Sequence, residues 1–552
     1  MKKVLQLLLL LIINQVATAQ SDMFTRQDTL RGTITPERAW WDLTYYHLDV
    51  EIFPEQKKII GNNTVRYTVI NEHNVMQIDL QEPMKITRVV QNTQNLTFER
   101  EGSVYWINLK DKQQPNSSNE LIIYFEGSPT IAKNPPWDGG FTWQKDKNGN
   151  HFIANANQGI GASVWWPCKD HPEDEVNNMN ISVTVPEGLM DVSNGRLIKT
   201  DRNKKKKTKT YHWEVNNPIN NYGVNISVGD YVHFGEVYEG EKGKLDCNYY
   251  VLSYNLEKAK VQFKDATRTI QALEHWFGPY PFYEDGYKLV EVPYLGMEHQ
   301  SAVTYGNGFT NGYKGSDLSG TGWGLKFDFI IVHESGHEWF ANNLTNKDVA
   351  DMWIHESFTS YSENLFLNYH YNKDASSAYV LGTRMSIQND RPIIGTYNVN
   401  HRGSSDMYYK GANILHTLRQ IVNDDDKWRQ ILQGLNKDFY HQTVSSAQVE
   451  KYLGEKVGRN LTGFFDQYLR DTRVPVLEYR KMNNQLAFKW SNAVKNFDMP
   501  IRIMVNDEER WIEPTTNWNM IKGLPDRYDI TVDTNFYVGE LDSMGKYSEV
   551  KP

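Results

Sequence analysis

The sequence has only two cysteines among its 552 residues, which excludes the class of small proteins held together by disulfides. Cys168 and Cys247 could pair, but the sequence alone does not show whether they meet. Basic charge is not in excess either, because 59 Lys and Arg residues stand against 68 Asp and Glu residues, for a net charge of −9. We therefore expect no nucleic-acid partner. The one basic run, Lys204–Lys207, is interpreted as the exposed turn of a hairpin.

Long apolar runs are also missing, except at the N-terminus. Residues 1–19 combine Lys2 and Lys3, an apolar run of about ten residues and the small residues Ala17-Thr18-Ala19, a pattern typical of a secretory signal peptide. A run of about ten residues is too short to cross the roughly 30 Å hydrocarbon core of a bilayer. We expect a cleaved signal peptide, a mature protein without a stable membrane span, and export to a periplasm or to the extracellular space.

The pattern of apolar residues divides the chain into three parts. Residues 20–248 alternate apolar and polar positions between turn residues, which predicts an antiparallel β-domain. Residues 249–473 are mostly helical in pattern, with a first helical stretch that should end at Gly278. Residues 474–552 return to short alternating strands and predict a small immunoglobulin-like β-sandwich. The expected fold class is multidomain α+β.

The most specific local motif is His333-Glu334-Ser335-Gly336-His337. Residues four apart lie on one face of a helix, so both imidazoles can bind one Zn²⁺ while Glu334 faces a water molecule at the metal. The apolar segment FDFIIV before the motif predicts that this helix is buried. A catalytic zinc ion needs a third protein ligand, and Glu356, on a second helix-compatible segment, could supply it.

At these spacings, His333, Glu334, His337 and Glu356 resemble the zinc signature of the M1 family of gluzincin aminopeptidases. The resemblance implies a thermolysin-like, mostly helical catalytic domain with one Zn²⁺ per chain, bound by His333, His337 and Glu356. Family members commonly carry a large helical C-terminal domain. This sequence resembles a three-domain form without it.

A second motif lies upstream, where Leu295-Gly296-Met297-Glu298-His299 resembles the family's Gly-Ala-Met-Glu-Asn exopeptidase motif. A carboxylate at a sheet edge beside the cleft can pair with a free ammonium group, which only a chain terminus offers there. The resemblance assigns Gly296, Met297 and Glu298 to substrate binding. Leu295-Gly296 stands in place of the family's Gly-Ala and His299 in place of its Asn, and the effect of these replacements is left open.

Three further residues gain roles from the same resemblance. Tyr408, in Tyr408-Tyr409-Lys410-Gly411, matches the family tyrosine that stabilises the oxyanion. Gln158 stands where a Gln or Glu helps to hold the substrate amine. Glu363, seven residues after Glu356, matches an acidic residue that supports a zinc ligand.

Taken together, these motifs imply a zinc aminopeptidase that acts on peptides with a free N-terminus. Glu334 would serve as the general base for a zinc-activated water, Tyr408 would stabilise the oxyanion, and Glu298 with Gln158 would bind the α-amine. Two alternatives stay open: a catalytically silent binding protein on the same scaffold, and an epoxide hydrolase or endopeptidase with the same motifs. The sequence does not determine the preferred first residue, the peptide length or the oligomeric state.

Overall fold

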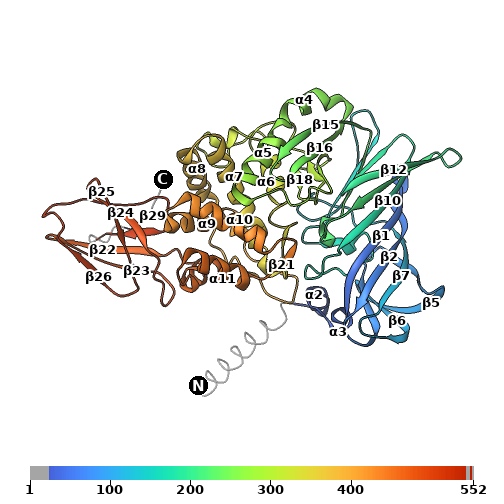
Figure 1. Cartoon of the computed structure of the whole chain (residues 1–552), viewed down its shortest axis with the longest axis horizontal. Helices are drawn as coiled ribbons and strands as arrows, with labels where there is room; N and C mark the ends of the chain where they lie inside the picture. The colour runs from blue at the N-terminus through green and yellow to red at the C-terminus, as the bar shows by residue number, and fades with distance from the viewer. Residues whose placement is uncertain (1–23, 543–546, 550–552) are drawn as a thin grey trace, which may run out of the picture.

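The computed structural model of the chain describes residues 24–542 and 547–549, and the predicted signal peptide (1–19) lies outside them. Three regions follow one another along the long axis: a β-rich domain at one end, a helical domain in the middle and a small β-domain at the other end (Figure 1). This arrangement confirms the predicted α+β fold class. Within the described part, no helix is both long and apolar enough to cross a membrane.

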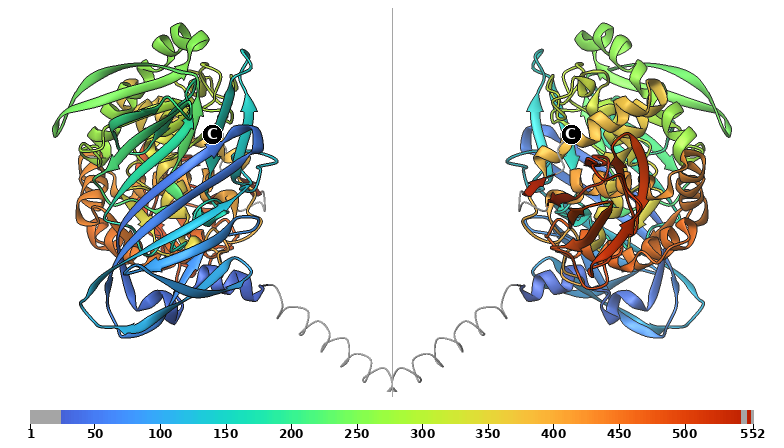
Figure 2. Two further views of the ribbon diagram at one scale, coloured as in Figure 1. Left: turned by 90° about the vertical axis from the view of Figure 1, so that its right-hand side faces the viewer. Right: turned by 90° about the vertical axis from the view of Figure 1, so that its left-hand side faces the viewer.

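A ten-stranded sheet forms the body of the N-terminal domain and faces the viewer in Figure 2, left. Its strands pair mostly antiparallel, as their alternation predicts. The exception is the parallel pair of β1 and β10, in which β10 lies on the side of β1 opposite to β2. In spatial order the strands are β12 (Arg196–Asn203), β13 (Thr208–Val215), β10 (Asn178–Pro186), β1 (Trp41–Phe53), β2 (Lys58–Val69), β7 (Ser118–Gly127), β4 (Lys85–Gln91), β5 (Gln94–Glu101), β6 (Val104–Gln113) and β3 (His73–Asp79).

A smaller, four-stranded sheet completes this domain and carries one of the predicted site residues. Gln158 follows two residues after the end of β9. The basic run Lys204–Lys207 forms the turn between β12 and β13, as expected from its pattern. The strands of the smaller sheet are β11 (Met190–Ser193), β14 (Ile226–Gly229), β9 (His151–Ala156) and β8 (Gly140–Lys145).

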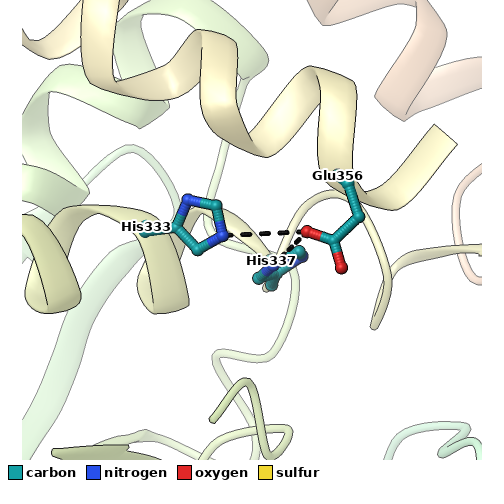
Figure 3. Close-up of side chains that lie close together, drawn as sticks. All are labelled: His333, His337 and Glu356. Atoms are coloured by element: carbon teal, nitrogen blue, oxygen red, sulfur yellow. Dashed lines mark ion pairs between the residues drawn. The ribbon is translucent and has the colours of Figure 1, made fainter. Parts of the chain in front are cut away.

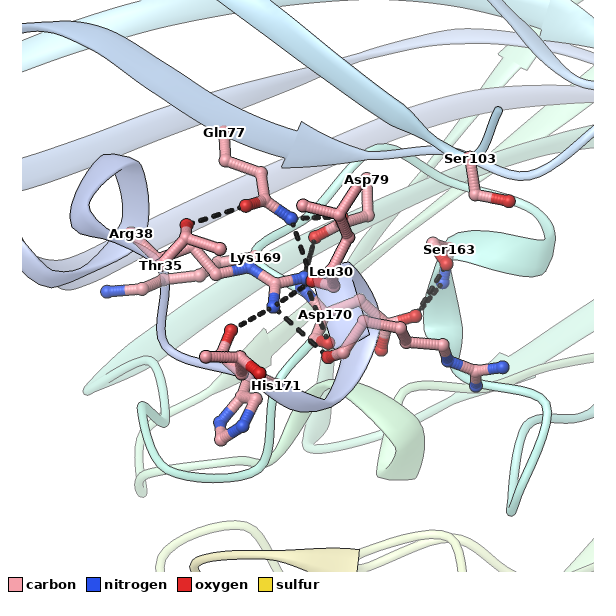
Figure 4. Close-up of polar contacts among 12 residues, drawn as sticks. Leu30, Thr35, Arg38, Gln77, Asp79, Ser103, Ser163, Lys169, Asp170 and His171 are labelled. Atoms are coloured by element: carbon pink, nitrogen blue, oxygen red, sulfur yellow. Dashed lines mark hydrogen bonds and ion pairs between the residues drawn. The ribbon is translucent and has the colours of Figure 1, made fainter. Parts of the chain in front are cut away.

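A buried ion pair holds the loop after Gln158 against the large sheet (Figure 4). Arg38, on the short helix α3 (Pro36–Ala39), is fully buried and its guanidinium lies 2.5 Å from the Asp79 carboxylate on β3. Asp79 also accepts a hydrogen bond from the backbone N–H of Asp170, and the Asp170 carboxylate accepts from the backbone N–H of Ser163. A charge can be buried in a core when it is paired and hydrogen-bonded. This network can therefore fix the position of the loop while the Arg38–Asp79 pair stays buried.

The middle domain begins with a five-stranded sheet, whose edge strand β18 leads directly into Glu298. The predicted domain boundary at 248/249 falls inside β16, and both β15 and β16 hydrogen-bond to this sheet, so the sheets divide near residue 230. Alternation could not place this division, because the strands on both sides of it alternate alike. In spatial order the strands are β15 (Tyr231–Gly240), β16 (Gly243–Leu252), β17 (Tyr287–Glu291), β19 (Val303–Tyr305) and β18 (Gly296–Met297).

Helices make up most of the middle domain, as the sequence predicts. The first helical stretch breaks at Phe263 into two helices and ends at Gly278, whose φ of 91° suits glycine. The helices of this domain are α4 (Leu256–Gln262), α5 (Lys264–Phe277), α6 (Phe329–Gly336), α7 (Trp353–His370), α8 (Lys373–Thr383), α9 (Tyr409–Val422), α10 (Asp425–Asp438), α11 (Ser446–Val457) and α12 (Thr462–Leu469). The domain also contains a parallel pair of short strands, β20 (Leu344–Asn346) and β21 (Gln442–Val444). Another helix, α2 (Arg26–Gly32), lies near the start of the chain.

Two glycines allow the helices of the site to approach closely. A Cβ atom at Gly336 on α6 would lie 2.7 Å from Ser362 Oγ on α7, and one at Gly411 on α9 would lie 2.0 Å from Ser357 Oγ on α7. A larger residue would hold these helices apart. The glycines therefore let α6 and α9 pack directly against α7.

Two small sheets form the C-terminal domain and confirm the predicted β-sandwich. Their buried side chains form one continuous core with those of the helical domain, so the two are packed as a unit. One sheet contains β26 (Asn519–Lys522), β23 (Gln485–Ser491), β22 (Val476–Met482), β28 (Gly539–Leu541) and β29 (Tyr547–Glu549); the other contains β25 (Glu508–Ile512), β24 (Ile501–Val505) and β27 (Ile530–Val532).

The two cysteines lie in different cores. Cys168 is buried in the N-terminal domain and Cys247 is buried in the core shared by the other two, and both are free thiols. The disulfide that the sequence left open is therefore not formed.

Candidate active site

Two histidines and a glutamate converge where α6 meets α7 (Figure 3). The Asp328 side chain caps α6 by accepting from the backbone N–H groups of Ile330 and Ile331. His333 and His337 lie four residues apart at the end of this helix, and Glu356 lies in the first turn of α7. All three side chains are buried. The helical spacing that the sequence predicts is thus present, and the second helix supplies the carboxylate.

The distances among these three residues fit a tetrahedral zinc ion. Glu356 Oε2 lies 3.7 Å from His333 Nε2 and 3.4 Å from His337 Nε2. Ligand atoms about 2.1 Å from a tetrahedral zinc ion lie about 3.4 Å from one another. Glu356 Oε2 is also buried without a hydrogen-bond partner in the described structure. A buried acceptor of this kind is costly unless a cation satisfies it.

The other nitrogen of each imidazole is held by an acceptor, which leaves Nε2 free for the metal. His333 Nδ1 lies 2.9 Å from Glu363 Oε1, and His337 Nδ1 lies 2.9 Å from the backbone oxygen of Phe340. An acceptor at Nδ1 keeps the proton on that nitrogen and directs the Nε2 lone pair toward the site. Glu363 itself accepts a hydrogen bond of 2.6 Å from the Tyr379 hydroxyl.

Electrostatics keep the third ligand ionised and the neighbouring glutamate ready for proton transfer. Burial alone would raise the pKa of Glu356, but the electrostatic effect of the neighbouring His337 and His333 lowers it below its usual range. Glu334 is also buried, and desolvation raises the pKa of its carboxyl to about 7. A carboxylate with a pKa near neutrality can both take up and return a proton.

Two further polar groups, Glu298 and Gln158, lie next to the metal ligands. Glu298 is 1% exposed, and one of its carboxylate oxygens lies within 4.8 Å of ligand atoms of both Glu334 and His337. Gln158 donates from Nε2 to Glu298 Oε1 at 2.8 Å and to Glu356 Oε1 at 2.9 Å. Both N–H bonds of this amide are therefore used on carboxylates, which leaves the Gln158 oxygen available as an acceptor.

Tyr408 completes the ring of polar groups at the start of α9. Its ring stacks on the His333 imidazole with centroids 6.1 Å apart. Burial raises the pKa of the Tyr408 phenol well above 10, and the Glu356 carboxylate acts in the same direction. The hydroxyl therefore keeps its proton at neutral pH and can donate it in a hydrogen bond.

The predicted site residues line one cavity, with a single member behind it. That member is Glu363, which contacts His333 from the far side. His299, from the same motif as Glu298, is buried and does not line the cavity; in the described structure neither of its ring nitrogens has a hydrogen-bond partner. The predicted residues that line the cavity are Gln158, Gly296, Met297, Glu298, His333, Glu334, His337, Glu356 and Tyr408.

Sequence reasoning missed several residues of the site. Thr359, whose hydroxyl lies 3.0 Å from His337 Nδ1, stands three residues after Glu356 on α7, so helical periodicity could have indicated it. Tyr379, which holds Glu363, gives no such signal because α8 is a separate helix. Trp137 of the N-terminal domain also lines the cavity and belongs to no sequence motif.

Gly296, which stands where the family motif has Ala, has a steric reason in this structure, and this reason gives a prediction about stability. A Cβ atom at Gly296 would lie 2.6 Å from Ile330 Cγ2 and 3.2 Å from Glu334 Cγ. We expect Gly296→Ala to lower the free energy of unfolding by about 1–3 kcal/mol, because α6 cannot move away from β18 without cost. Urea denaturation would measure the change. Ile330→Ala removes the obstructing methyl group. Adding Gly296→Ala to Ile330→Ala should therefore lower the free energy of unfolding by less than adding it to the unchanged protein. Equal losses in the two backgrounds would contradict this explanation.

The fold and the site together define a class of protein: two histidines near the end of one helix and a glutamate of the next, beside a five-stranded sheet, form a ligand set of the gluzincin type that could hold a metal ion. Residues 43–222 match the Peptidase M1 N-terminal domain, and residues 261–468 match the Peptidase family M1 domain. The chain belongs to peptidase family M1.

Individual relatives are distant. Aminopeptidase N of Lactococcus lactis subsp. lactis is 22% identical over 515 residues, which cover 87% of this chain and 56% of the relative. Probable aminopeptidase 1 of Sulfurisphaera tokodaii is 23% identical over 388 residues, which cover 67% of this chain and 47% of the relative. The chain thus spans about half the length of the curated relatives it matches.

A solved structure supports the fold. The crystal structure of a mutant M1 zinc metallopeptidase from Deinococcus radiodurans, bound to a Tyr-Ser-Ala substrate, superposes with a TM-score of 0.65 at 19% identity. The match covers 79% of this chain and 95% of that one. At this identity the likeness establishes the architecture.

Proposed function

We propose that the protein is a zinc aminopeptidase that removes the first residue from peptides with a free N-terminus. The position of Glu298 supports this most directly, because its carboxylate lies within 4.8 Å of both Glu334 and His337. An ammonium group paired with Glu298 therefore leaves space for about one residue before the scissile bond. A substrate without a terminal amine would place an uncharged group against a buried carboxylate, which is costly.

His333, His337 and Glu356 would hold the zinc ion. Bound zinc would polarise the scissile carbonyl and lower the pKa of a water molecule beside it. Glu334 faces the same cavity and takes the proton from the attacking water, then returns it to the leaving amine. Tyr408 donates a hydrogen bond to the developing oxyanion. Gln158 and Glu298 accept hydrogen bonds from the α-amine and fix the substrate's direction.

The direct test is hydrolysis of aminoacyl-arylamides by the zinc-loaded protein, with and without a chelator. An aminopeptidase releases the arylamine, stops when zinc is removed and recovers when zinc is restored. Zinc binding without any turnover would instead indicate a silent binding protein. Efficient cleavage of N-acetylated peptides, or hydrolysis of an epoxide in place of arylamides, would favour the other alternative, an endopeptidase or epoxide hydrolase.

Glu298→Ala should affect substrates with a free amine far more than substrates without one. We expect kcat/KM for an aminoacyl-arylamide to fall by about a hundredfold, since a charged hydrogen bond to a buried partner is worth about 2–3 kcal/mol. The slow hydrolysis of the N-acetylated analogue should change little. Equal losses on both substrates would remove the proposed role of Glu298.

Tyr408→Phe should lower kcat by about a hundredfold to a thousandfold with little change in zinc content, because one donor to the oxyanion is lost. Steady-state kinetics and metal analysis measure the two quantities. Tyr409→Phe is the matched comparison, since it removes the neighbouring hydroxyl from the same helix start. A larger loss in Tyr409→Phe than in Tyr408→Phe would transfer the role to Tyr409.

We also propose that the protein is exported. The support is the sequence of residues 1–19 alone, with its basic start, short apolar run and small residues before position 20. N-terminal sequencing of the protein recovered from cell fractions tests this. A mature terminus near Gln20 in the periplasm or medium agrees with it, and an intact Met1 in the cytoplasm contradicts it.

A further inference from the structure

A second cavity adjoins the active site and has a distinctly basic wall. It shares Trp137, Gln158, Ser405 and Tyr408 with the cavity that holds the metal ligands, but none of those ligands lines it. Its lining includes Arg391, His401 and Arg402, from the segment between α8 and α9. The cavity is therefore suited to a part of the substrate that is recognised without reacting.

Two of the shared residues, Gln158 and Tyr408, indicate which part of the substrate enters. Under the proposed function, Gln158 holds the α-amine and Tyr408 contacts the carbonyl oxygen of the first residue. The Cα atom of that residue joins the amine to the carbonyl, so its side chain leaves from between them. A cavity bordered by both Gln158 and Tyr408 is in the position to receive this side chain.

The positive charge of this cavity is not neutralised by Asp138, the acidic residue in its lining. Among the described residues that line it, Asp138 is the only acid, and its carboxylate accepts from the backbone N–H groups of Lys133 and Asn134 at 2.6 and 2.9 Å. Arg391 donates to the backbone oxygen of Gly403 at 3.2 Å and lies 4.0 Å from Asp390. The Arg402 side chain is exposed and forms no hydrogen bond or ion pair with the described residues. Its guanidinium is thus available to an anionic ligand.

The backbone around Arg402 is fixed rather than free to move away. Thr396 N–H donates to the backbone oxygen of His401, and Ser404 N–H donates to the backbone oxygen of Pro392. Gly403 packs so closely that a Cβ atom there would lie 1.8 Å from the Ile393 backbone oxygen. Burial and Glu356 raise the pKa of Tyr408, and Arg402 opposes that rise, in keeping with a guanidinium that is electrostatically close to the phenol.

We propose that this cavity binds the side chain of the first residue and that Arg402 recognises a carboxylate in it, so that the preferred substrates are peptides beginning with glutamate or aspartate. The proposal rests on the proposed aminopeptidase function. A guanidinium binds a carboxylate through two parallel hydrogen bonds, whereas the neutral amide of glutamine cannot offer two acceptors to it. Discrimination between these two isosteric side chains is therefore the expected signature.

The test compares glutamyl- and glutaminyl-arylamides with the zinc-loaded protein near neutral pH. We expect kcat/KM to be about fivefold higher for the glutamyl substrate, the upper range for an ion pair that involves an exposed side chain such as Arg402. Arg402→Gln should abolish this ratio while kcat/KM for the glutaminyl substrate stays nearly constant. Arg402→Glu should turn the preference toward lysyl- and arginyl-arylamides. Lys314→Gln is the matched control, because it removes one positive charge beside Trp137 without lining the cavity, and it should keep the wild-type ratio.

Two results would overturn the proposal. One is turnover of neutral arylamides without any preference for glutamyl over glutaminyl, which leaves the aminopeptidase function intact and removes only the acidic specificity. The other is a fall in kcat/KM in Arg402→Gln for Ala-Ala but not for its C-terminal amide. Arg402 would then bind the carboxylate at the far end of the peptide instead of the first side chain. Failure to hydrolyse any arylamide would overturn the proposed function and this inference with it.

Discussion

Replacement of Glu334 by glutamine is expected to lower kcat by roughly a thousandfold or more while zinc stays bound. Glu334 is not one of the three residues whose atoms converge on the metal position, so its loss removes no ligand. Glutamine has nearly the same shape, but it cannot accept a proton. Because burial raises the pKa of the Glu334 carboxyl to about 7, this group is matched to proton transfer at neutral pH, and its replacement should be felt in the chemical step.

Two measurements on the same preparation check this expectation: zinc content per chain and kcat on an aminoacyl-arylamide. Glu455→Gln serves as the matched control, since Glu455 is an exposed residue of α11 whose nearest cation, Lys451, lies 3.9 Å away. It should behave like the unchanged protein. If Glu334→Gln kept its activity within about tenfold, general-base catalysis by this residue would be wrong.

Glu356→Ala is expected to abolish zinc binding at micromolar zinc and to lower kcat/KM at least a hundredfold at the same concentration, because two histidines alone bind zinc weakly. The substitution also removes the acceptor that receives Gln158 Nε2 at 2.9 Å. Glu363→Gln is the informative comparison: it keeps all three ligands and changes only the acceptor behind His333, so zinc affinity should fall by about tenfold to a hundredfold rather than vanish. Competition with a chromogenic chelator measures both.

The same ligands predict an effect of the metal on stability. Zinc that binds the folded chain and not the unfolded one raises the free energy of unfolding, by about 4 kcal/mol when free zinc is a thousandfold above the dissociation constant. We expect chelation to lower the melting temperature of the unchanged protein and to leave that of Glu356→Ala nearly constant. A chelator that shifted both equally would act elsewhere on the protein.

The sequence predicted the convergence of His333, His337 and Glu356, because their arrangement is mostly local. His333 and His337 are one helical turn apart, and a turn of helix fixes their relative direction whatever the rest of the chain does. Glu356 belongs to the next helix in the chain, so only one packing contact, that of α6 on α7, had to be correct. The strands and helices themselves also follow from periodicity, as the helix end at Gly278 illustrates.

The sequence predicted less where the structure depends on which distant segments pair with each other. The alternation of β15 and β16 gives no sign that they join the sheet of the helical domain, and the boundary at 248/249 was therefore placed inside β16. Nor could the sequence decide whether Cys168 and Cys247 meet, since that depends on which core each one enters. The reason for glycine at position 296 appears only when α6 is seen against β18.

By itself, then, the sequence determined the three-part α+β organisation and the zinc signature, since both depend on periodicity and on contacts within a few turns of chain. Only the tertiary structure decided how Gln158, Glu298 and Tyr408 gather around the metal position, because they come from three separate elements and meet through packing of α9 on α7 and of the N-terminal domain on the cleft. It alone placed Arg402 in the same cavity as Tyr408, because Arg402 lies in a segment without a periodic pattern. Side-chain specificity depends on such loop positions, and these are fixed by long-range contacts rather than by local pattern.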